Sequence, residues 1–315
     1  MSEEIIVKSQ KLTKQYGQTT ALKDADITIK KGSIYGLVGN NGAGKTTFLK
    51  ILAGHIHPTS GTFVMMGADN ERAYREVRKH TGAIIENPGF YPKLTAKQNL
   101  EYYRIQRGIP GKDLVMEMLR EVGLEKAANK KFDALSLGMK QRLALALTLM
   151  GDPELLILDE PINGLDPSGI IEIRNFLLKL NKEKNVTVLI SSHILSELEN
   201  IATDYGFLNK GELVEQVSAK MLREKCRTYL EIKVTNASEY AALLETEMLC
   251  TNYKVLPGNC IHILEHVENV SEYSALAVNH GIGLLSFDMK EINLENYYMR
   301  MIGAENQNEN VQKEV

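Results

Sequence analysis

The sequence predicts an α/β fold with a mainly parallel β-sheet at its core, and three observations support this prediction. A glycine-rich loop at residues 39–47 lies between an apolar run and a helical pattern, the order typical of a phosphate-binding loop. Short apolar runs at 155–158 and 186–190 have the composition of strands buried on both faces. Strand and helix patterns alternate through about residue 215, which favours a parallel sheet.

The remaining elements of this part follow from local patterns. A helix should begin at Lys45 and end before Gly54, because glycine commonly follows a helix C-terminus. Helical periodicity over Ala96–Ala128, broken at Gly108–Gly111, predicts a helical insertion over about residues 92–150. The insertion separates two strand-rich parts, and the sheet core is expected to include antiparallel strands. Further strands are expected at Ile5–Ser9, Ala25–Ile29, Ile34–Val38, Thr62–Met66 and Gly82–Ile85.

A second, smaller domain is expected over residues 216–302, where the patterns weaken and no phosphate motif recurs. Its predicted strands and helices suggest a small α+β domain of β-α-β-β-α-β type. The strands are Tyr229–Val234, Cys260–Leu264 and Ile282–Phe287, and the helices are Ser238–Leu249, Val270–His280 and Leu294–Ile302. Residues 303–315 are polar and are expected to be disordered.

The composition excludes several classes of protein. With 315 residues, 43% hydrophobic and 24% charged, the chain is typical of a globular protein of two domains. A net charge of −3 gives no reason to expect nucleic-acid binding, and no apolar stretch approaches the ~18–20 residues of a membrane helix. The acidic start lacks a signal-peptide pattern, and three cysteines without paired metal spacing suit a reducing compartment. A cytoplasmic location is expected.

The glycine-rich loop carries the spacing of a nucleotide-binding motif. Gly39 is followed, after four residues, by Gly44, Lys45 and Thr46. Glycines allow backbone N–H groups to surround an anion, and the helix that starts at Lys45 adds the positive end of its dipole. Lys45 should reach the β- and γ-phosphates, and the Thr46 hydroxyl should bind Mg²⁺. The residues expected to bind the nucleotide are Gly39, Asn40, Asn41, Gly42, Ala43, Gly44, Lys45, Thr46 and Thr47.

Two adjacent carboxylates, Asp159 and Glu160, follow the apolar strand at 155–158. Ligands of open α/β sheets bind at the carboxyl ends of strands. Because successive side chains of a strand point opposite ways, the two acids should have different roles. Asp159 is the expected Mg²⁺ partner, and Glu160 is free to orient or deprotonate the attacking water. His193 follows the strand at 186–190, so it should reach the same edge and bind a γ-phosphate oxygen.

A second anion site is expected at Leu135–Arg142, where Ser136 and Gly138 precede a long apolar helix. Ser136 is a suitable N-cap, and a helix N-terminus attracts anions. Since the chain has one phosphate loop, this site has no nucleotide of its own. A two-fold pair of chains would place it over the phosphate loop of the other copy; an ordinary capped helix is the alternative.

The order of these motifs resembles the ATP-binding cassette ATPases of ABC transporters. The similarity covers residues 1 to about 215, and it rests on the phosphate loop, Leu-Ser-x-Gly, Leu-Leu-Ile-Leu-Asp-Glu-Pro, Gly164-Leu-Asp-Pro167 and Ser-Ser-His193. The resemblance implies a P-loop NTPase cassette that binds ATP and Mg²⁺, with Tyr16 stacked on adenine. It implies Asp159 as a magnesium ligand, Glu160 as the catalytic glutamate and His193 as a catalytic switch residue. It further implies that a second copy is contacted through Ser136, Leu137, Gly138, Met139 and Asp166.

The sequence departs from the family pattern in two places. Leu137 and Met139 stand where the family usually has glycine and glutamine, and Glu86 stands where it has a glutamine. A carboxylate at 86 is still a suitable Mg²⁺ ligand, but it adds negative charge near the γ-phosphate and donates no hydrogen bond. We therefore expect Glu86 to alter metal affinity or hydrolysis rate. Both departures resemble the bacitracin and lantibiotic exporter branch of the family.

The resulting expectation is an ATPase subunit that powers a separate membrane permease, for export of a peptide antibiotic or other drug. It would act as a homodimer, peripheral on the inner face of the membrane through the permease, without nucleic acid. One alternative is a soluble ABC ATPase that acts on ribosomes or DNA, although the chain has no basic stretch or coiled-coil repeat. The sequence is also compatible with a P-loop phosphotransferase, or with a cassette that binds ATP without hydrolysing it.

Overall fold

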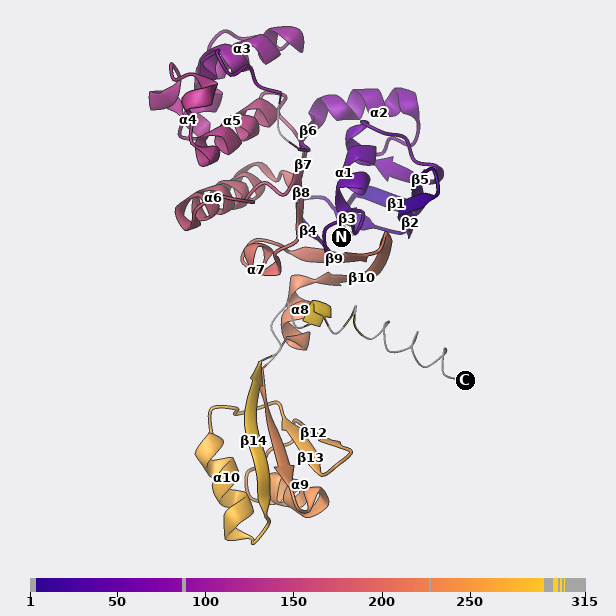
Figure 1. The fold of residues 1–315 in the computed structure, drawn as a ribbon, viewed down its shortest axis with the longest axis vertical. Helices are drawn as coiled ribbons and strands as arrows, with labels where there is room; N and C mark the ends of the chain where they lie inside the picture. Colours follow the sequence, from indigo (N-terminus) through magenta and orange to yellow (C-terminus); the bar gives the residue numbers. More distant parts are fainter. Residues whose placement is uncertain are drawn as a thin grey trace. The chain divides into compact units, whose positions relative to one another are not determined.

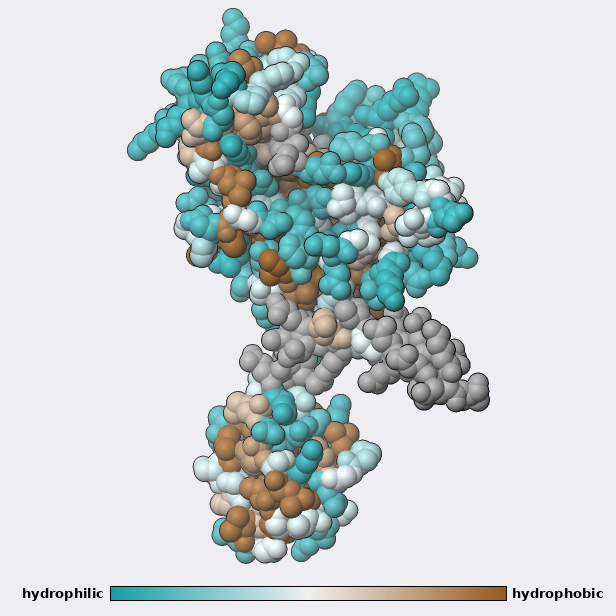
Figure 2. Space-filling view, viewed as in Figure 1, coloured by the Kyte–Doolittle hydropathy of each residue, from teal (hydrophilic) through white to brown (hydrophobic). Residues whose placement is uncertain are grey.

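The computed structural model describes residues 4–86, 89–226, 228–291, 297–299, 301 and 303. The chain forms two compact units, Met1–Ala219 and Lys220–Val315 (Figure 1). Hydrophilic side chains cover most of the visible face of the first unit, with smaller apolar areas between them (Figure 2). None of the helices within the described residues is long and apolar enough to cross a membrane.

A six-stranded sheet in the order β10-β9-β4-β8-β7-β6 forms the centre of the first unit. The five strands from β9 to β6 run parallel, and only β10 pairs antiparallel, with β9. The mainly parallel sheet predicted from the apolar runs is therefore confirmed. Its strands are β4 (Ile34–Val38), β6 (Thr81–Ile84), β7 (Leu155–Asp159), β8 (Thr187–Ser192), β9 (Asp204–Asn209) and β10 (Glu212–Ser218).

A second, antiparallel sheet is organised around one long strand, β1 (Ile5–Tyr16), with which three more strands pair. These strands are β2 (Thr19–Ala25), β3 (Thr28–Lys30) and β5 (Ser60–Met65). The single strand predicted at 25–29 is wrong, because the chain leaves the sheet between β2 and β3. There the Asp26 carboxylate accepts a hydrogen bond from the Lys11 backbone N–H, at 2.6 Å.

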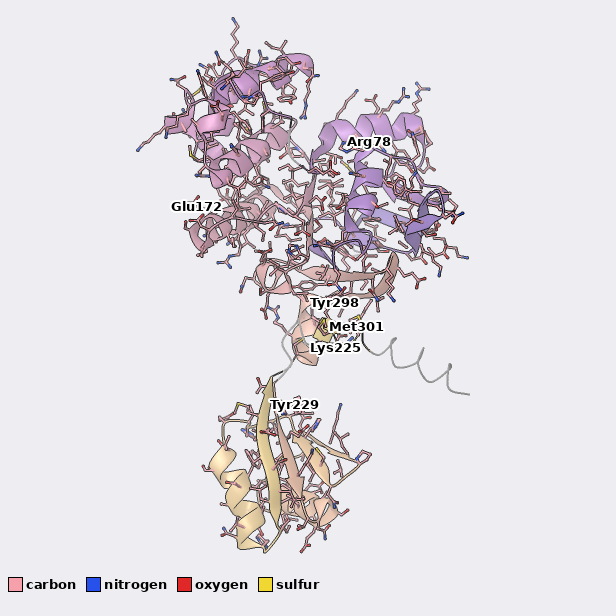
Figure 3. All side chains as sticks on the ribbon, in the orientation of Figure 1. Arg78, Glu172, Lys225, Tyr229, Tyr298 and Met301 are labelled. Carbon is pink, nitrogen blue, oxygen red and sulfur yellow. The ribbon has the colours of Figure 1, made fainter. Side chains whose placement is uncertain are left out.

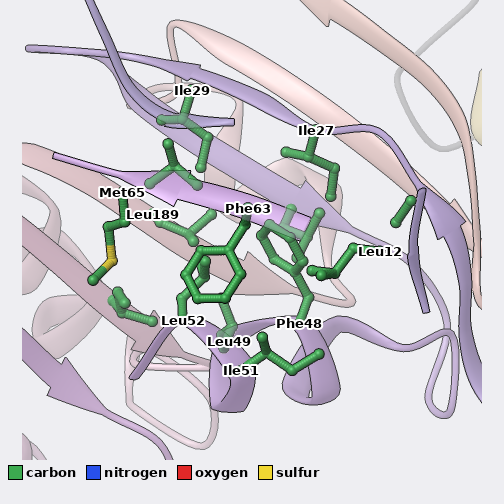
Figure 4. Packing of buried hydrophobic residues seen from close by; sticks show 14 of the residues in the cluster. Leu12, Ile27, Ile29, Phe48, Leu49, Ile51, Leu52, Phe63, Met65 and Leu189 are labelled. Atoms are coloured by element: carbon green, nitrogen blue, oxygen red, sulfur yellow. The ribbon is translucent and has the colours of Figure 1, made fainter. Parts of the chain in front are cut away.

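Helix α1 (Lys45–Ala53) packs between the two sheets, and this packing fixes the phosphate loop at its start. Phe48 and Leu52 are fully buried against Leu12, Phe63 and further apolar side chains of both sheets (Figure 4). Fully burying a side chain of this size contributes about 1.5–3 kcal/mol. The start of α1 is therefore held by the hydrophobic core.

The helical insertion predicted from the sequence is confirmed. Helices α3 (Ala96–Gln106), α4 (Leu114–Glu121) and α5 (Leu137–Leu149) pack against one another. The break predicted between α3 and α4 contains Gly108 and Gly111, which have φ angles of 65° and 94°. The remaining helices of this part are α2 (Glu71–Val77), η1 (Arg78–His80), η2 (Glu125–Ala127), η3 (Phe132–Ala134), α6 (Pro167–Lys184) and α7 (Leu195–Leu198). Helix α8 (Ala219–Lys225) begins at the last residue of the first unit and continues into the second.

The second unit has the β-α-β-β-α-β order that the sequence predicts, around a sheet in the order β12-β13-β11-β14. The pattern missed β12, which has mostly exposed residues. The elements are β11 (Thr228–Val234), α9 (Ala237–Thr246), β12 (Tyr253–Leu256), β13 (Cys260–Ile263), α10 (Val270–Asn279) and β14 (Leu284–Glu291). Most of the helix predicted at 294–302, and the tail from residue 304 onward, lie outside the described residues.

Candidate functional site

Glycines at two positions allow the loop between β4 and α1 to take its shape. Gly44 has a φ angle of 104°, and a Cβ atom there would lie 2.6 Å from the Ala21 carbonyl oxygen. A Cβ atom on Gly39 would lie 2.5 Å from the carbonyl oxygen of Leu208. Side chains at either position would strain the backbone or push β2 and β9 away from the loop.

The loop is also held by backbone hydrogen bonds from the turn between β9 and β10. The Gly211 N–H donates to the Ala43 carbonyl at 3.0 Å, and the Gly211 carbonyl accepts from the Lys23 N–H at 2.8 Å. The loop is therefore fixed between β2 and the β9–β10 hairpin, in addition to its own strand and helix.

Lys45 is the charged side chain of the loop, and it is buried, with 5% of its surface exposed. Its Nζ donates to the carbonyl oxygens of Gly39 at 2.6 Å and Asn40 at 3.3 Å, and it lies 3.4 Å from Glu160 Oε1. A buried cation is costly unless it is paired and hydrogen-bonded. Here it is placed where it can bind phosphate oxygens.

Asp159 and Glu160 make different contacts, as the alternation of side chains along a strand requires. Asp159 Oδ2 accepts from Thr46 Oγ1 at 2.8 Å, and Asp159 Oδ1 accepts from Ser191 Oγ at 2.6 Å. The same Ser191 hydroxyl accepts a hydrogen bond from the Glu160 backbone N–H at 3.0 Å. Since β7 and β8 are neighbours, with Asp159 paired to Ser191, the parallel sheet brings these groups together.

Glu160 and His193 form a close pair just beyond the ends of β7 and β8. His193 Nδ1 lies 2.7 Å from Glu160 Oε2. Glu160 has a φ angle of 48°, a conformation that costs a non-glycine residue free energy. Its carboxylate contacts Lys45 and the histidine, whereas the Asp159 carboxylate contacts Thr46 and Ser191.

These groups line a pocket of about 370 Å³ at the carboxyl edge of the parallel strands. Its lining consists of phosphate-loop residues and of side chains from the ends of β7 and β8, together with Ala21. The lining residues are Ala21, Asn41, Gly42, Ala43, Gly44, Lys45, Thr46, Thr47, Glu160, Asn163 and His193. Seven of the nine expected loop residues, from Asn41 to Thr47, thus meet the candidate catalytic residues Glu160 and His193 in one place. Gly39, Asn40 and Asp159 lie outside this lining.

The expected residue Tyr16 lies outside this set of lining residues. It ends β1, its side chain is exposed, and the Nζ of Lys14 lies 5.0 Å from the centre of its ring. Glu86 also lies outside the lining, and Lys50 Nζ of α1 donates to its Oε1 at 2.6 Å. This hydrogen bond, together with the charge of Lys50, lowers the pKa of the Glu86 carboxyl below its usual range.

The segment around Ser136 begins α5 as an ordinary N-cap. The Ser136 hydroxyl accepts a hydrogen bond from the Met139 backbone N–H at 3.3 Å. Leu137 is 51% exposed, and its Cδ2 would lie 3.3 Å from a Cβ atom on Gly164. Asp166 is the residue before helix α6, the helix that carries Glu172 (Figure 3). The Asp166 Oδ2 atom accepts a hydrogen bond from the Ser168 hydroxyl at 2.6 Å.

Comparison with known proteins identifies the family. A family model described as ABC transporter matches residues 22–163. The chain is 42% identical to the bacitracin transport ATP-binding protein BcrA of Enterococcus faecalis, over 96% of this chain and 98% of the relative. The chain belongs to the ABC transporter ATP-binding proteins. The lantibiotic transport ATP-binding protein SrtF of Streptococcus pyogenes is 42% identical over 66% of this chain and 89% of that protein.

A solved cassette supports the same assignment. The dimeric, post-hydrolysis ATP-binding cassette MJ0796 bound to ADP and phosphate superposes with a TM-score of 0.61, at 28% identity, over 68% of this chain and 98% of that chain. The protein is therefore an ATP-hydrolysing cassette of an ABC transporter. Its resemblance to BcrA extends over nearly the whole chain, and so includes the second unit.

Ser191, which hydrogen-bonds both the Asp159 carboxylate and the Glu160 backbone N–H, was not predicted as a site residue. The signal was present, since Ser191 is part of the Ser-Ser-His193 sequence at the end of β8. Its role depends on the register between β7 and β8, which no local pattern states. Lys50 was also missed, because it is 36 residues from Glu86 in the sequence and only the folded chain brings the two side chains together.

Proposed function

We propose that this cassette powers the export of a peptide antibiotic, of the bacitracin or lantibiotic kind, through a separate membrane permease. The relatives named for bacitracin and lantibiotic transport support this substrate class. The proposal includes peripheral attachment to the inner face of the membrane through that permease, as a transport ATP-binding protein requires. The observation that carries the proposal is the 42% identity to BcrA over nearly the full length of both chains.

The phosphate loop and Asp159 are the proposed site of ATP and Mg²⁺. Thr46 and Asp159 contribute hydroxyl and carboxylate oxygens that lie 2.8 Å apart, and oxygen donors are those that Mg²⁺ prefers. Glu86 is a third oxygen donor proposed for this ion. When bound, Mg²⁺ neutralises charge on the β- and γ-phosphates. Lys45 binds the same phosphates, and Tyr16 stacks on the adenine.

Glu160 is the proposed general base for hydrolysis. Its carboxylate stands at the edge of the pocket, where it accepts a proton from the water that attacks the γ-phosphate. His193, with Nδ1 2.7 Å from this carboxylate, orients it and donates a hydrogen bond to the phosphate. Because Lys45 Nζ lies 3.4 Å from Glu160 Oε1, the lysine also holds this carboxylate in position until ATP binds.

A second copy of the chain is proposed to complete each site. Ser136, Leu137, Gly138 and Met139 start α5 without contributing to the lining of the pocket in their own chain. In a homodimer, these residues and Asp166 of one copy face the phosphate loop of the other. The dimeric form of the solved cassette MJ0796 supports this arrangement.

The permease is proposed to dock on the aromatic surface that follows β6. Tyr91 and Tyr102 are both exposed, and their rings meet edge to face with centres 4.8 Å apart. Ile105 on α3 is also exposed. Exposed aromatic and apolar side chains of this kind are typical of protein–protein contacts.

The test combines the rate of phosphate release with the molecular mass of the protein in solution with ATP, which reports whether it is a monomer or a dimer. Glu160→Gln is expected to slow phosphate release at least ~100-fold, to retain ATP binding and to accumulate as a dimer. Glu183→Gln, which changes an exposed glutamate of α6, serves as the matched control and should behave as the wild type. Loss of ATP binding in Glu160→Gln would contradict the proposed role of this residue.

Export is tested in cells that express the cassette together with the membrane permease encoded beside it. We expect resistance to a bacitracin-type or lantibiotic peptide with the wild-type pair and none with Glu160→Gln. Co-purification with ribosomes or DNA in place of a membrane protein would overturn the transport proposal. Transfer of phosphate to an acceptor, in place of its release, would overturn the hydrolysis proposal.

A further inference from the structure

The sheet of the second unit packs its two helices on one face and leaves the opposite face to polar side chains. Leu230, Ile232, Ile261 and Ile263 belong to the core formed with α9 and α10. Because side chains alternate along a strand, the residues between them point to the opposite face. That face carries Tyr229, Glu231, Lys233, Cys260 and His262.

Three metal-ligating side chains meet on this face. Glu231 on β11 is paired directly with His262 on β13, and Cys260 lies two residues earlier on the same strand. The carboxylate oxygen, the thiol sulfur and the imidazole nitrogen lie within 4.8 Å of one another. Within the described residues, no second group of three or more such side chains comes together in this way.

We propose that Cys260, His262 and Glu231 bind one divalent transition-metal ion of the zinc class. Tetrahedral coordination with zinc bonds of about 2.0–2.3 Å places the ligand atoms about 3.5 Å apart. His262 Nε2 and Glu231 Oε2 are already 3.1 Å apart, so small side-chain rotations bring all three groups into coordination. A water molecule or an outside ligand takes the fourth position.

The donor set selects the kind of metal. One thiolate and one imidazole favour Zn²⁺ and its spectroscopic substitute Co²⁺, whereas Mg²⁺ and Ca²⁺ prefer oxygen ligands. The metal bound here therefore differs in chemistry from the Mg²⁺ proposed at the phosphate loop. The two sites are distinguishable by the ion that each one binds.

The surroundings of the cluster are partly enclosed. His262 and Glu231 expose 21% and 22% of their side chains, and Cys260 is buried. The ring of Tyr229 (Figure 3) packs on the His262 ring, with centres 4.3 Å apart. Burial and the nearby Glu231 raise the pKa of the Cys260 thiol, so metal binding displaces a proton from sulfur to solvent.

Outside the nucleotide site, three further histidine–carboxylate pairs among the described residues lack this third group. The nitrogen–oxygen distances are 2.9 Å for His280 and Glu247, 3.4 Å for His57 and Glu71, and 3.8 Å for His266 and Glu268, and all six side chains are substantially exposed. None of these pairs belongs to a group of three among the described residues. A cross-strand hydrogen bond would by itself explain the pairing of His262 with Glu231. The thiol of Cys260 in the same cluster adds a sulfur ligand, which favours a transition metal such as zinc.

The test is a titration of the nucleotide-free full chain with Co²⁺, followed by optical absorption. The wild type is expected to bind one Co²⁺ with a thiolate-to-cobalt charge-transfer band, which Zn²⁺ then abolishes. Cys260→Ser should lose the band, and His262→Gln should weaken binding at least about 10- to 100-fold, since even outer partners of metal ligands contribute that much. Cys226→Ser and His280→Gln are the matched controls and should retain the band.

A second measurement uses the unchanged protein, in case a variant does not fold. Zn²⁺ is expected to protect Cys260 from alkylation, measured peptide by peptide, while Cys226 reacts at the same rate with or without the metal. Cys250 is an internal reference, because burial raises the pKa of its thiol to about 11 and keeps it unreactive. The absence of a charge-transfer band in the wild type, or equal alkylation of Cys260 with and without Zn²⁺, would overturn the proposal.

Discussion

The phosphate loop and the Ser136 segment both lead into the N-terminus of a helix, but their own chain surrounds them to different degrees. The loop before α1 is held by β2, by the β9–β10 turn and by the ends of β7 and β8. The Ser136 segment has a capping hydrogen bond to Met139, and its neighbour Leu137 is half exposed. One helix start therefore faces groups of its own chain, while the other presents its N-terminus outward.

In the proposed homodimer, these two helix starts are the two parts of one site. Enclosed groups such as Lys45 can be placed only by the fold of their own chain, since burying a cation requires partners. An exposed helix N-terminus needs no partner until an anion or a second copy approaches it. The predictions below test this division, beginning with the largest expected effect.

The division predicts that two inactive variants restore each other. Lys45→Ala and Ser136→Asp should each slow phosphate release at least ~100-fold, since each disturbs charge stabilisation at the phosphate. Aspartate is also a good N-cap, so α5 should remain intact. Mixed before ATP is added, the two variants should recover about a quarter of the wild-type rate, because half of the dimers then contain one intact site.

The matched control mixes Lys45→Ala with Glu160→Gln. Both changes lie on the phosphate-loop side, so no dimer of the mixture contains an intact site, and phosphate release should stay at the level of the single variants. Recovery in this control, or none in the first mixture, would show that the Ser136 segment does not act on a second copy.

The two glycines that precede or start these helices should respond oppositely to alanine. Gly44→Ala should lower the free energy of unfolding by about 1–3 kcal/mol, because it combines a positive φ angle with a close approach to Ala21. Gly138→Ala should raise it by about 0.5–1 kcal/mol, because Gly138 lies within a helix and its Cβ would meet nothing closer than 3.8 Å. Denaturant unfolding of the first unit measures both; equal effects would contradict the comparison.

Removal of the cap at α5 should have a smaller effect on stability. Ser136→Ala loses the hydrogen bond to the Met139 N–H, which should cost about 1 kcal/mol of stability. Ser136→Asp, which keeps a capping oxygen, should lie within a few tenths of the wild type. A pair of thermal melts checks this, and a larger loss with aspartate than with alanine would show that Ser136 does more than cap the helix.

The smallest effect is expected at Glu86, which lies outside the lining of the pocket. Glu86→Gln removes a carboxylate that is 68% exposed and pairs with Lys50, and solvent screens the interactions of such an exposed charge. The Mg²⁺ concentration for half-maximal hydrolysis should therefore rise about threefold. Phosphate release measured over a series of Mg²⁺ concentrations gives this value, and an unchanged midpoint would exclude Glu86 from the metal site.

Much of the first unit follows from its sequence, because buried parallel strands and a phosphate loop leave local signals. Leu155–Leu158 is apolar throughout and forms a strand buried on both faces, as predicted. The strand predicted at 25–29 fails because Asp26 turns out of the sheet to bind the Lys11 backbone. Strand β12 was missed because its exposed residues have no apolar alternation.

The candidate site was predictable as a set of residues, but not as a set of contacts. The motifs locate Lys45, Asp159, Glu160 and His193. The hydrogen bonds through Ser191, and the pairing of Glu86 with Lys50, depend on strand register and helix packing across long sequence separations. In the second unit the sequence offered no metal spacing, because Glu231 and Cys260 become neighbours only when β11 pairs with β13.

The hydrogen bond from the Gly211 N–H to the Ala43 carbonyl determines when, during synthesis of the chain, the phosphate loop can become rigid. The turn that holds the nucleotide motif, at Gly211, is synthesised more than 160 residues after the motif itself. A chain emerging from the ribosome therefore carries the complete motif long before it carries a rigid loop. ATP binding should mark the moment when synthesis has passed the β9–β10 hairpin.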